Sequence, residues 1–147
     1  MATFYNRGKF KIANAGWTTA ADIRALVLTH ASTLPAGAND PDLNFVSELL
    51  AVGGVTEASG TGYARQALTS EAVIEDDTNN TANLDAADLS YSSTNSGRWV
   101  AVVLYLEGGG TDASRDLISL NDLASPLTTN GGNVTLTVDV LGFIGLG

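Results

Sequence analysis

The sequence predicts a mainly β protein, an antiparallel β-sandwich or barrel with one or two short helices near the N-terminus. Apolar residues make up 44% of the 147 residues and charged residues only 16%, which is typical of a sheet-rich chain with a sparsely charged surface. Residues 99–106 are consecutive apolar residues, as in a central strand covered on both faces. Turn-forming residues separate about six strand candidates, which favours a single β-rich domain over residues 1–147.

Residues 1–16 are expected to form an N-terminal arm that contains a short helix over residues 4–15. Three apolar side chains fall near one helical stripe, namely Phe4, Phe10 and Ile12. Gly8 lowers the stability of such a helix by roughly 1 kcal/mol relative to alanine. The helix is therefore expected to be poorly anchored.

A strand and a second helix are predicted next. In residues 22–30 the apolar side chains alternate as in a first core strand that is buried on one face and partly covered on the other. In residues 39–54, Asp40 can cap free amide groups, Pro41 suits the first helical position, and the glycines at 53–54 end the run. These signals predict a helix that begins next to Asp40.

Strands account for the rest of the chain. Four segments have strand patterns: residues 71–77, 86–93, 98–106 and 116–123. A hairpin-type turn at 130–132 then precedes a last strand with one solvent-exposed face and one buried face. The apolar C-terminal tail, residues 141–147, either completes the sheet of the domain or contacts a partner, and the sequence leaves both open.

The charges are unevenly distributed. There are 16 acidic and 7 basic residues, and the net charge of −9 argues against a nucleic-acid partner, because such affinity comes largely from Lys and Arg. The basic residues near the start are Arg7, Lys9 and Lys11, and the acidic residues of the middle segment are Glu71, Glu75, Asp76, Asp77, Asp85 and Asp88. This asymmetry indicates either a docking end or a solvated face that arose by chance.

Cysteine is absent, which excludes disulfides, thiol nucleophiles and cysteine-based zinc sites. The longest apolar run, residues 99–106, is far shorter than the ~20 residues that a membrane helix needs, so no membrane partner is expected. The N-terminus has no apolar stretch typical of a secretory signal.

Residues 60–68, GTGYARQAL, begin like a phosphate-binding loop. A dinucleotide fingerprint requires a third glycine at position 65, where this chain has arginine, and a helix directly downstream. The glycines are better explained as a turn with positive φ that delivers Tyr63 and Arg65 to opposite faces of the next strand. Arg65 is then expected to pair with an acid of the middle segment.

No residue pattern predicts catalysis, a cofactor or a metal, and the protein is not expected to be an enzyme. The oxygen-rich stretch at residues 75–88 offers calcium-type ligands, but its spacing matches no EF-hand and favours a solvated turn. His30 is the only histidine and has no predictable partner, so a structural role is favoured. No G-x-S-x-G elbow is present.

Four segments, in their order along the chain, resemble a group of small virion structural proteins of tailed bacteriophages. These segments are YNRGKFKIANAG (5–16), GTGYARQAL (60–68), EDDTNNTANLDAADLSYSS (75–93) and WVAVVLYLEGGG (99–110). Tyr5, Asn6 and Arg7 match the opening motif of the group, and Gly62, Tyr63 and Arg65 match the central one. Gly8 inside the expected helix and the apolar end depart from the pattern, which leaves open how long the helix is and what the tail does.

The resemblance implies a structural virion protein that decorates or cements the capsid shell, with the major capsid protein as its partner and no catalytic residues. It also implies assembly in the host cytoplasm, incorporation into the virion, and a homo-oligomer, for which a trimer is expected. Many symmetric copies can share modest contacts. Two docking elements are expected, one with Phe4, Tyr5, Arg7, Lys9 and Lys11, the other with Phe143 and Ile144.

Two alternatives remain open at the level of sequence. The first is a different structural component of the same particle, such as a neck, tail or head-fibre base protein. The second is a carbohydrate-binding adhesion module that uses Trp17, Tyr91 or Trp99 as a stacking platform. The apolar run around Trp99 argues for a core position instead.

Overall fold

The computed structural model describes residues 2–18, 21–138 and 144–146. These residues form a mainly β structure of antiparallel sheets with two short α-helices in the N-terminal part of the chain. The predicted fold class is thereby confirmed. Within the described part of the chain the sheets stay open, so the barrel alternative does not apply.

The largest sheet has the order β1-β9-β8-β2-β3; β3 pairs with the C-terminal end of β2, and β4 pairs with the N-terminal half of the same edge of β2. Its strands are β1 (Ala2–Phe4), β9 (Leu117–Thr128), β8 (Arg98–Leu106), β2 (Ile23–Thr29), β3 (Thr56–Glu57) and β4 (Gln66–Ala67). The apolar run at 99–106 lies in β8, at the centre of the sheet. Every residue from Trp99 to Tyr105 is buried, because both faces of the sheet are covered.

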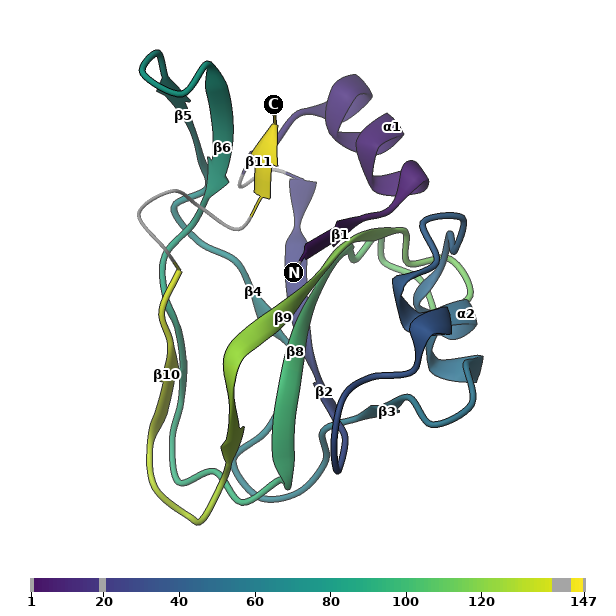
Figure 1. Cartoon of the computed structure of the whole chain (residues 1–147), viewed down its shortest axis with the longest axis vertical. Helices are drawn as coiled ribbons and strands as arrows, with labels where there is room; N and C mark the ends of the chain where they lie inside the picture. Colours follow the sequence, from purple (N-terminus) through teal and green to yellow (C-terminus); the bar gives the residue numbers. More distant parts are fainter. Residues whose placement is uncertain (1, 19–20, 139–143, 147) are drawn as a thin grey trace.

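One face of the main sheet is covered by two smaller sheets (Figure 1). One pairs β7 (Leu89–Tyr91) with β10 (Val134–Leu136), and the other has the order β11-β6-β5, with β5 (Ala72–Asp76), β6 (Thr81–Asp85) and β11 (Ile144–Leu146). The core between the main sheet and these two smaller sheets is called here the β-side core. It includes Trp17, Ile23, Val27, Leu84, Leu89, Tyr91, Trp99, Leu104 and Ile118.

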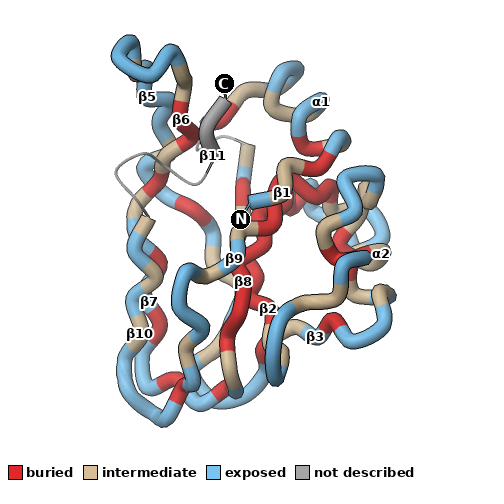
Figure 2. Tube along the Cα trace, in the orientation of Figure 1, coloured by how far each residue is buried: buried red, intermediate tan, exposed pale blue. Residues whose placement is uncertain are grey.

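The opposite face is covered by α2 (Val46–Ala51), the 3₁₀ helix η2 (Ala36–Asn39) and Tyr5, which directly precedes α1 (Asn6–Ala15) (Figures 1 and 2). The core on this side, called here the helix-side core, includes Tyr5, Leu26, Leu28, Val46, Leu49, Val103, Tyr105, Leu117 and Leu120. The second face of residues 22–30 is partly covered, as expected, since Leu26 and Leu28 are fully buried whereas the Arg24 side chain on the same face is 37% exposed.

The predicted start of α2 is wrong. The helix begins at Val46, because Phe45 is held extended by a bridge to Asp116 and the carboxylate of Glu48 accepts hydrogen bonds from the Asn44 and Phe45 amides. The carboxylate of Asp40 instead accepts a bond from the Asp42 amide in a local turn. A tertiary contact thus overrides the Asp-Pro start signal.

The helix α1 (Asn6–Ala15) starts later than expected, since Phe4 belongs to β1. It is also well anchored, because the Tyr5 amide donates to the Ile118 carbonyl and α1 lies directly on β9. A Cβ atom at Gly8 would stand 2.4 Å from the Ile118 carbonyl oxygen. Gly8 therefore permits the close approach of helix and strand, rather than weakening the helix.

Three strands differ in extent from the prediction. β9 is longer than the expected segment 116–123, because bulges at Trp99/Ala101 and Leu104/Tyr105 let it follow β8. β6 is a strand where the sequence predicts a solvated turn, because its sequence TANLD is largely polar. β10 ends at Leu136, earlier than the alternating pattern indicates. In the described part of the chain no helix is long and apolar enough to span a bilayer.

Candidate docking surface

Two basic residues of the expected N-terminal docking element hold α1 on the sheet. Arg7 Nε donates to Asp116 Oδ1 at 2.6 Å, and Lys11 Nζ lies 3.0 Å from Asp116 Oδ2. The guanidinium of Arg7 also lies over the Phe45 ring, 5.5 Å from its centroid. Asp116 is buried, so this double pairing also compensates for burying its charge. Both basic groups are thus already partnered.

Tyr5 is a core residue, and its expected role in docking is wrong. Its side chain is fully buried in the helix-side core, and its hydroxyl donates to the Ala38 carbonyl at 2.8 Å. Burial raises the pKa of the hydroxyl well above its usual range. Tyr5 therefore joins α1 to η2 and presents nothing to a partner.

The outward face of α1 carries Lys9 and Phe10. Phe10 is 60% exposed, and Lys9 Nζ donates to the nearby Asn6 Oδ1 at 3.4 Å. Because each helical residue turns about 100°, the contact of Gly8 with β9 points Phe10 to the opposite side. Phe4 is half-buried and packs against the β-side core.

The second expected docking element lies partly outside the described residues, since it includes Phe143. Ile144 belongs to β11, whose backbone pairs with Leu84 of β6. The backbone of residues 144–146 therefore completes a sheet of this chain. Of the two alternatives for the tail, this is the one that these three residues follow.

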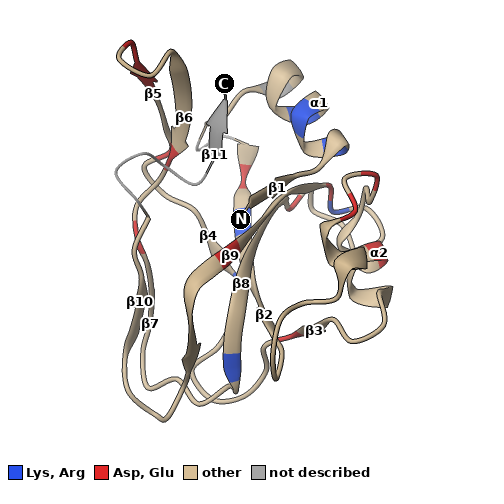
Figure 3. Cartoon of the chain, viewed as in Figure 1, with Lys and Arg blue, Asp and Glu red and all other residues tan. Residues whose placement is uncertain are grey.

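The β5–β6 hairpin projects from the same end of the molecule as α1 and β11 (Figure 1). Val73 and Ile74 on β5 are 57% and 37% exposed. Acidic residues gather at the hairpin tip, whereas the basic residues at this end lie on α1 (Figure 3). Sequence reasoning missed Val73 and Ile74 because a short apolar run in a strand usually indicates burial, whereas β5 is an outer strand at a projecting position.

The tip of the hairpin is an Asx-type turn. The carboxylate of Asp76 accepts hydrogen bonds from the side chain of Asn79 and from the amides of Asn79 and Thr78, and these bonds lower the pKa of Asp76. Across residues 2–18, 21–138 and 144–146 no group of three or more His, Cys, Asp or Glu side chains is arranged to hold a metal ion.

The GTGYARQAL segment is a turn, as predicted. Gly62 has φ +74°, and a Cβ there would lie 2.4 Å from the Ser92 carbonyl oxygen, so only glycine fits against this neighbouring loop. The hydroxyl of Tyr63 accepts a bond from the Val27 amide at 3.0 Å and donates to Glu57 Oε1 at 2.8 Å. The segment ties itself to β2 and β3.

Arg65 is the centre of an ion cluster that the sequence did not reveal. It donates to Glu57 at 2.8 and 2.6 Å and to Asp112 at 2.6 and 3.0 Å. The expected pairing with the acidic middle segment is wrong, and Tyr63 and Arg65 meet at one carboxylate, that of Glu57, rather than on opposite faces. Both partners lie in loops or short strands that only the tertiary fold brings together.

Arg115 extends this cluster. It pairs with Asp112 at 2.8 Å and with Glu107, and the guanidinium groups of Arg65 and Arg115 both lie over the ring of Tyr105, at 5.3 and 5.8 Å from its centroid. The hydrogen bonds from Arg65 hold the pKa of Asp112 at about 2, and the bond from Arg115 lowers the pKa of Glu107. The cluster fixes the 111–115 turn against β8 and the GTGYARQAL segment.

We expect this cluster to make stability fall in acid. Because the pKa of Asp112 is about 2 in the folded protein and 3.8 is its ordinary value, its contribution is fully present above about pH 4 and is lost as pH falls toward about 2. Thermal unfolding followed at several pH values across that window measures the effect. Asp112→Asn should be less stable at neutral pH and should show a flatter dependence on pH. An identical pH profile for variant and parent would contradict this role of Asp112.

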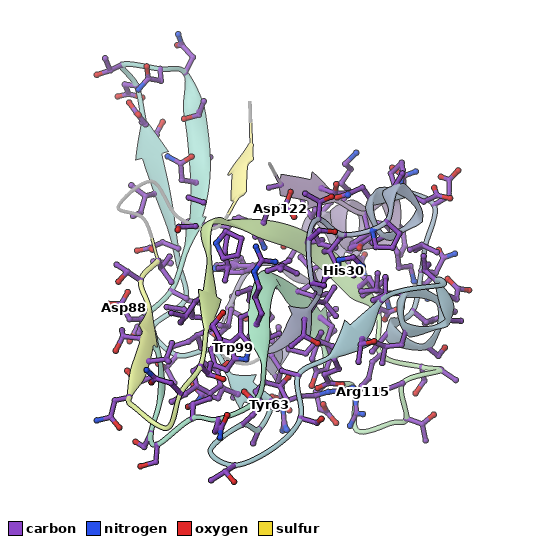
Figure 4. The ribbon with its side chains drawn as sticks, turned by 60° about the horizontal axis from the view of Figure 1, so that its bottom comes forward. His30, Tyr63, Asp88, Trp99, Arg115 and Asp122 are labelled. Carbon is purple, nitrogen blue, oxygen red and sulfur yellow. The ribbon has the colours of Figure 1, made fainter. Side chains whose placement is uncertain are left out.

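The remaining candidates from the sequence have structural positions. His30 Nδ1 accepts a bond from the Ser32 amide at 3.0 Å in a local turn. Tyr63, Tyr91 and Trp99 form one aromatic cluster, in which the rings of Tyr91 and Trp99 are 4.9 Å apart (Figure 4). Trp17 is 4% exposed, and its Nε1 donates to the Asp85 carbonyl. Trp17, Tyr91 and Trp99 are buried and offer no stacking platform to a carbohydrate.

Fold and surface together define a mainly antiparallel β protein with an apolar and charged end. No protein-family model matches the chain, and neither the curated proteins nor the solved structures contain a significant match to it.

Proposed function

We propose that this protein is a structural component of the virion of a tailed bacteriophage, where it decorates or cements the capsid shell. The major capsid protein is its partner, and the protein acts as a homo-oligomer, with a trimer as the expected state. It is assembled in the host cytoplasm and is carried in the particle. The proposal rests on the resemblance of the four ordered segments and on the surface described above.

One observation carries the proposal. The large exposed apolar side chains of the described residues, Phe10, Val73 and Ile74, lie on α1 and on the β5–β6 hairpin, at one end of the molecule. Exposed apolar groups gathered in this way usually mark protein contacts. A docking end of this kind suits a protein whose work is attachment.

The motifs behind the resemblance support the same proposal through the roles of their residues. Tyr5 and Arg7 fasten α1 to the sheet, Gly62 allows a tight turn, and Arg65 organises an ion cluster. These motif residues serve the fold, as expected of a family whose members share a scaffold rather than a reaction. Lys9 and Phe10 remain available on α1 for contact.

The test is a binding experiment with matching empty heads that lack the protein. Purified protein is mixed with the heads, the heads are sedimented, and bound copies per particle are measured against concentration. We expect saturation at hundreds of copies, because a shell offers many equivalent sites whose modest contacts act together. Ile74→Ser, at an exposed apolar position of the hairpin, should weaken binding. Ser125→Lys, an exposed change on β9 away from the docking end, is the control and should bind normally.

Removal of the N-terminal residues is not a usable variant, because β1 and Tyr5 belong to the main sheet and the helix-side core. Saturation near about a dozen copies would instead indicate a neck, tail or head-fibre base position, since such rings have few subunits. Failure of the folded parent protein to bind heads would overturn the proposal.

A further inference from the structure

The β5–β6 hairpin presents a groove on one of its faces. Val73 and Glu75 share this face because side chains alternate along β5, and Ala82 lies opposite Glu75 on β6. The groove is lined by Val73, Ala82, Glu75, Asp76, Asp77 and Asn80. It therefore combines an apolar floor with an acidic rim.

The outward face of α1 has the complementary character. Its exposed residues follow helical spacing and are Asn6, Lys9, Phe10, Ala13 and Asn14. Phe10 supplies an exposed aromatic ring. Arg7 and Lys11 are bound to the carboxylate of Asp116, whereas Lys9 donates only to the neutral side chain of Asn6 among the contacts described above. The helix α1 therefore presents one aromatic ring and one cationic side chain to solvent. The groove on the β5–β6 hairpin presents apolar and acidic side chains.

We propose that a second copy of this chain occupies the groove, with α1 of one copy lying on the β5–β6 hairpin of the next. Phe10 packs on Val73, and the ammonium of Lys9 faces the carboxylates of Glu75 and Asp77. The contact removes the exposed apolar surface of both elements from water and pairs a cation with an acidic rim. This contact goes beyond the virion role and does not depend on it.

The arrangement of the two elements favours an intermolecular contact. The hairpin and α1 lie on opposite sides of the molecule at the same end of its long axis, as the views in Figures 1 and 4 agree. A helix-to-hairpin contact joins two different surfaces, so it generates a ring when the rotation closes and a filament when it does not. Because both surfaces lie at the same end, copies related by rotation about the long axis can close into a ring.

Sedimentation of the purified full chain, without heads, tests the contact. The parent protein should form oligomers in a concentration-dependent manner, and Phe10→Ser or Val73→Ser should each weaken association at least about tenfold. Lys9→Glu and Glu75→Lys should each weaken it, and the double variant should recover part of the loss, since the charges are exchanged. Ser125→Lys on β9 is the control and should associate like the parent. Circular dichroism confirms that each variant is folded.

A mixing experiment separates the helix-to-hairpin contact from the pairing of two β5 edges. Phe10→Ser copies keep an intact hairpin and Val73→Ser copies keep an intact helix, so the two together should form a one-to-one complex that neither forms alone. A parent protein that stays monomeric would overturn the inference. So would a dimer that depends on β5 but not on Lys9 or Phe10, because that result indicates pairing of two β5 edges. Head binding is measured separately, so a monomeric parent protein that still binds heads would overturn this contact and the expected oligomer and leave the attachment to the shell supported.

Discussion

Replacing Gly8 with alanine is expected to reduce the free energy of unfolding by about 3 kcal/mol, at the upper end of typical overpacking costs. The added Cβ would lie 2.4 Å from the Ile118 carbonyl oxygen and 2.6 Å from its Cα, and these are backbone atoms that cannot turn aside. The helix α1 must then move away from β9. That movement strains the Tyr5 amide bond to Ile118 and the burial of the Tyr5 side chain.

Urea unfolding followed by tryptophan fluorescence measures this loss as a lower midpoint. Gly53→Ala is the matched control, because a Cβ at Gly53 would meet nothing within 4 Å and its φ is not positive. That control should be neutral or slightly stabilising. If the Gly8→Ala midpoint equals that of the parent, the close approach of α1 to β9 described here is wrong.

Replacing Arg65 with methionine should cost about 2–3 kcal/mol of stability, somewhat less than for a completely buried ion pair. The Arg65 side chain is 19% exposed, and its guanidinium donates to both Glu57 and Asp112. Its removal leaves two partly buried carboxylates with fewer donors and takes a cation from the face of Tyr105. The turn at 111–115 then loses one of its ties to the GTGYARQAL segment.

The control for this variant is Arg24→Met. Arg24 pairs with Asp22 in the open, with side-chain exposures of 37% and 49%, and its second contact, with Glu107, is longer at 3.7 Å, so its loss should cost less than about 1 kcal/mol. Arg65→Lys should fall between, because it keeps the charge but not the two-pronged geometry. Equal urea midpoints for Arg65→Met and Arg24→Met would show that the cluster contributes no more than a surface pair.

Local patterns were sufficient where burial alone decides the structure. The strands β8 and β2 were predicted because an unbroken or alternating apolar pattern has one favourable arrangement in a covered sheet. The turn at Gly60–Gly62 was predicted for a similar reason, since glycine tolerates positive φ at a point where the chain reverses. These features depend on neighbours in the chain.

Prediction failed where a distant residue decides the outcome. The start of α2 was wrong because Phe45 pairs with Asp116, far along the sequence. Arg65 was expected to find an acid in the middle segment, yet its partners are Glu57 and Asp112. Phe10 was placed on an apolar stripe, whereas the contact of Gly8 with Ile118 turns it outward.

The sequence by itself determined the mainly antiparallel β class and the positions of its central strands, because hydrophobic periodicity is a local property of the chain. It also indicated the basic start, of which Lys9 remains a predicted docking residue. The tertiary structure decided which side chains make contacts within the fold and which are exposed. Tyr5, Arg7 and Lys11 are engaged inside or against the sheet, while Phe10, Val73 and Ile74 face solvent. Only the packing of segments remote in sequence distinguishes these two sets.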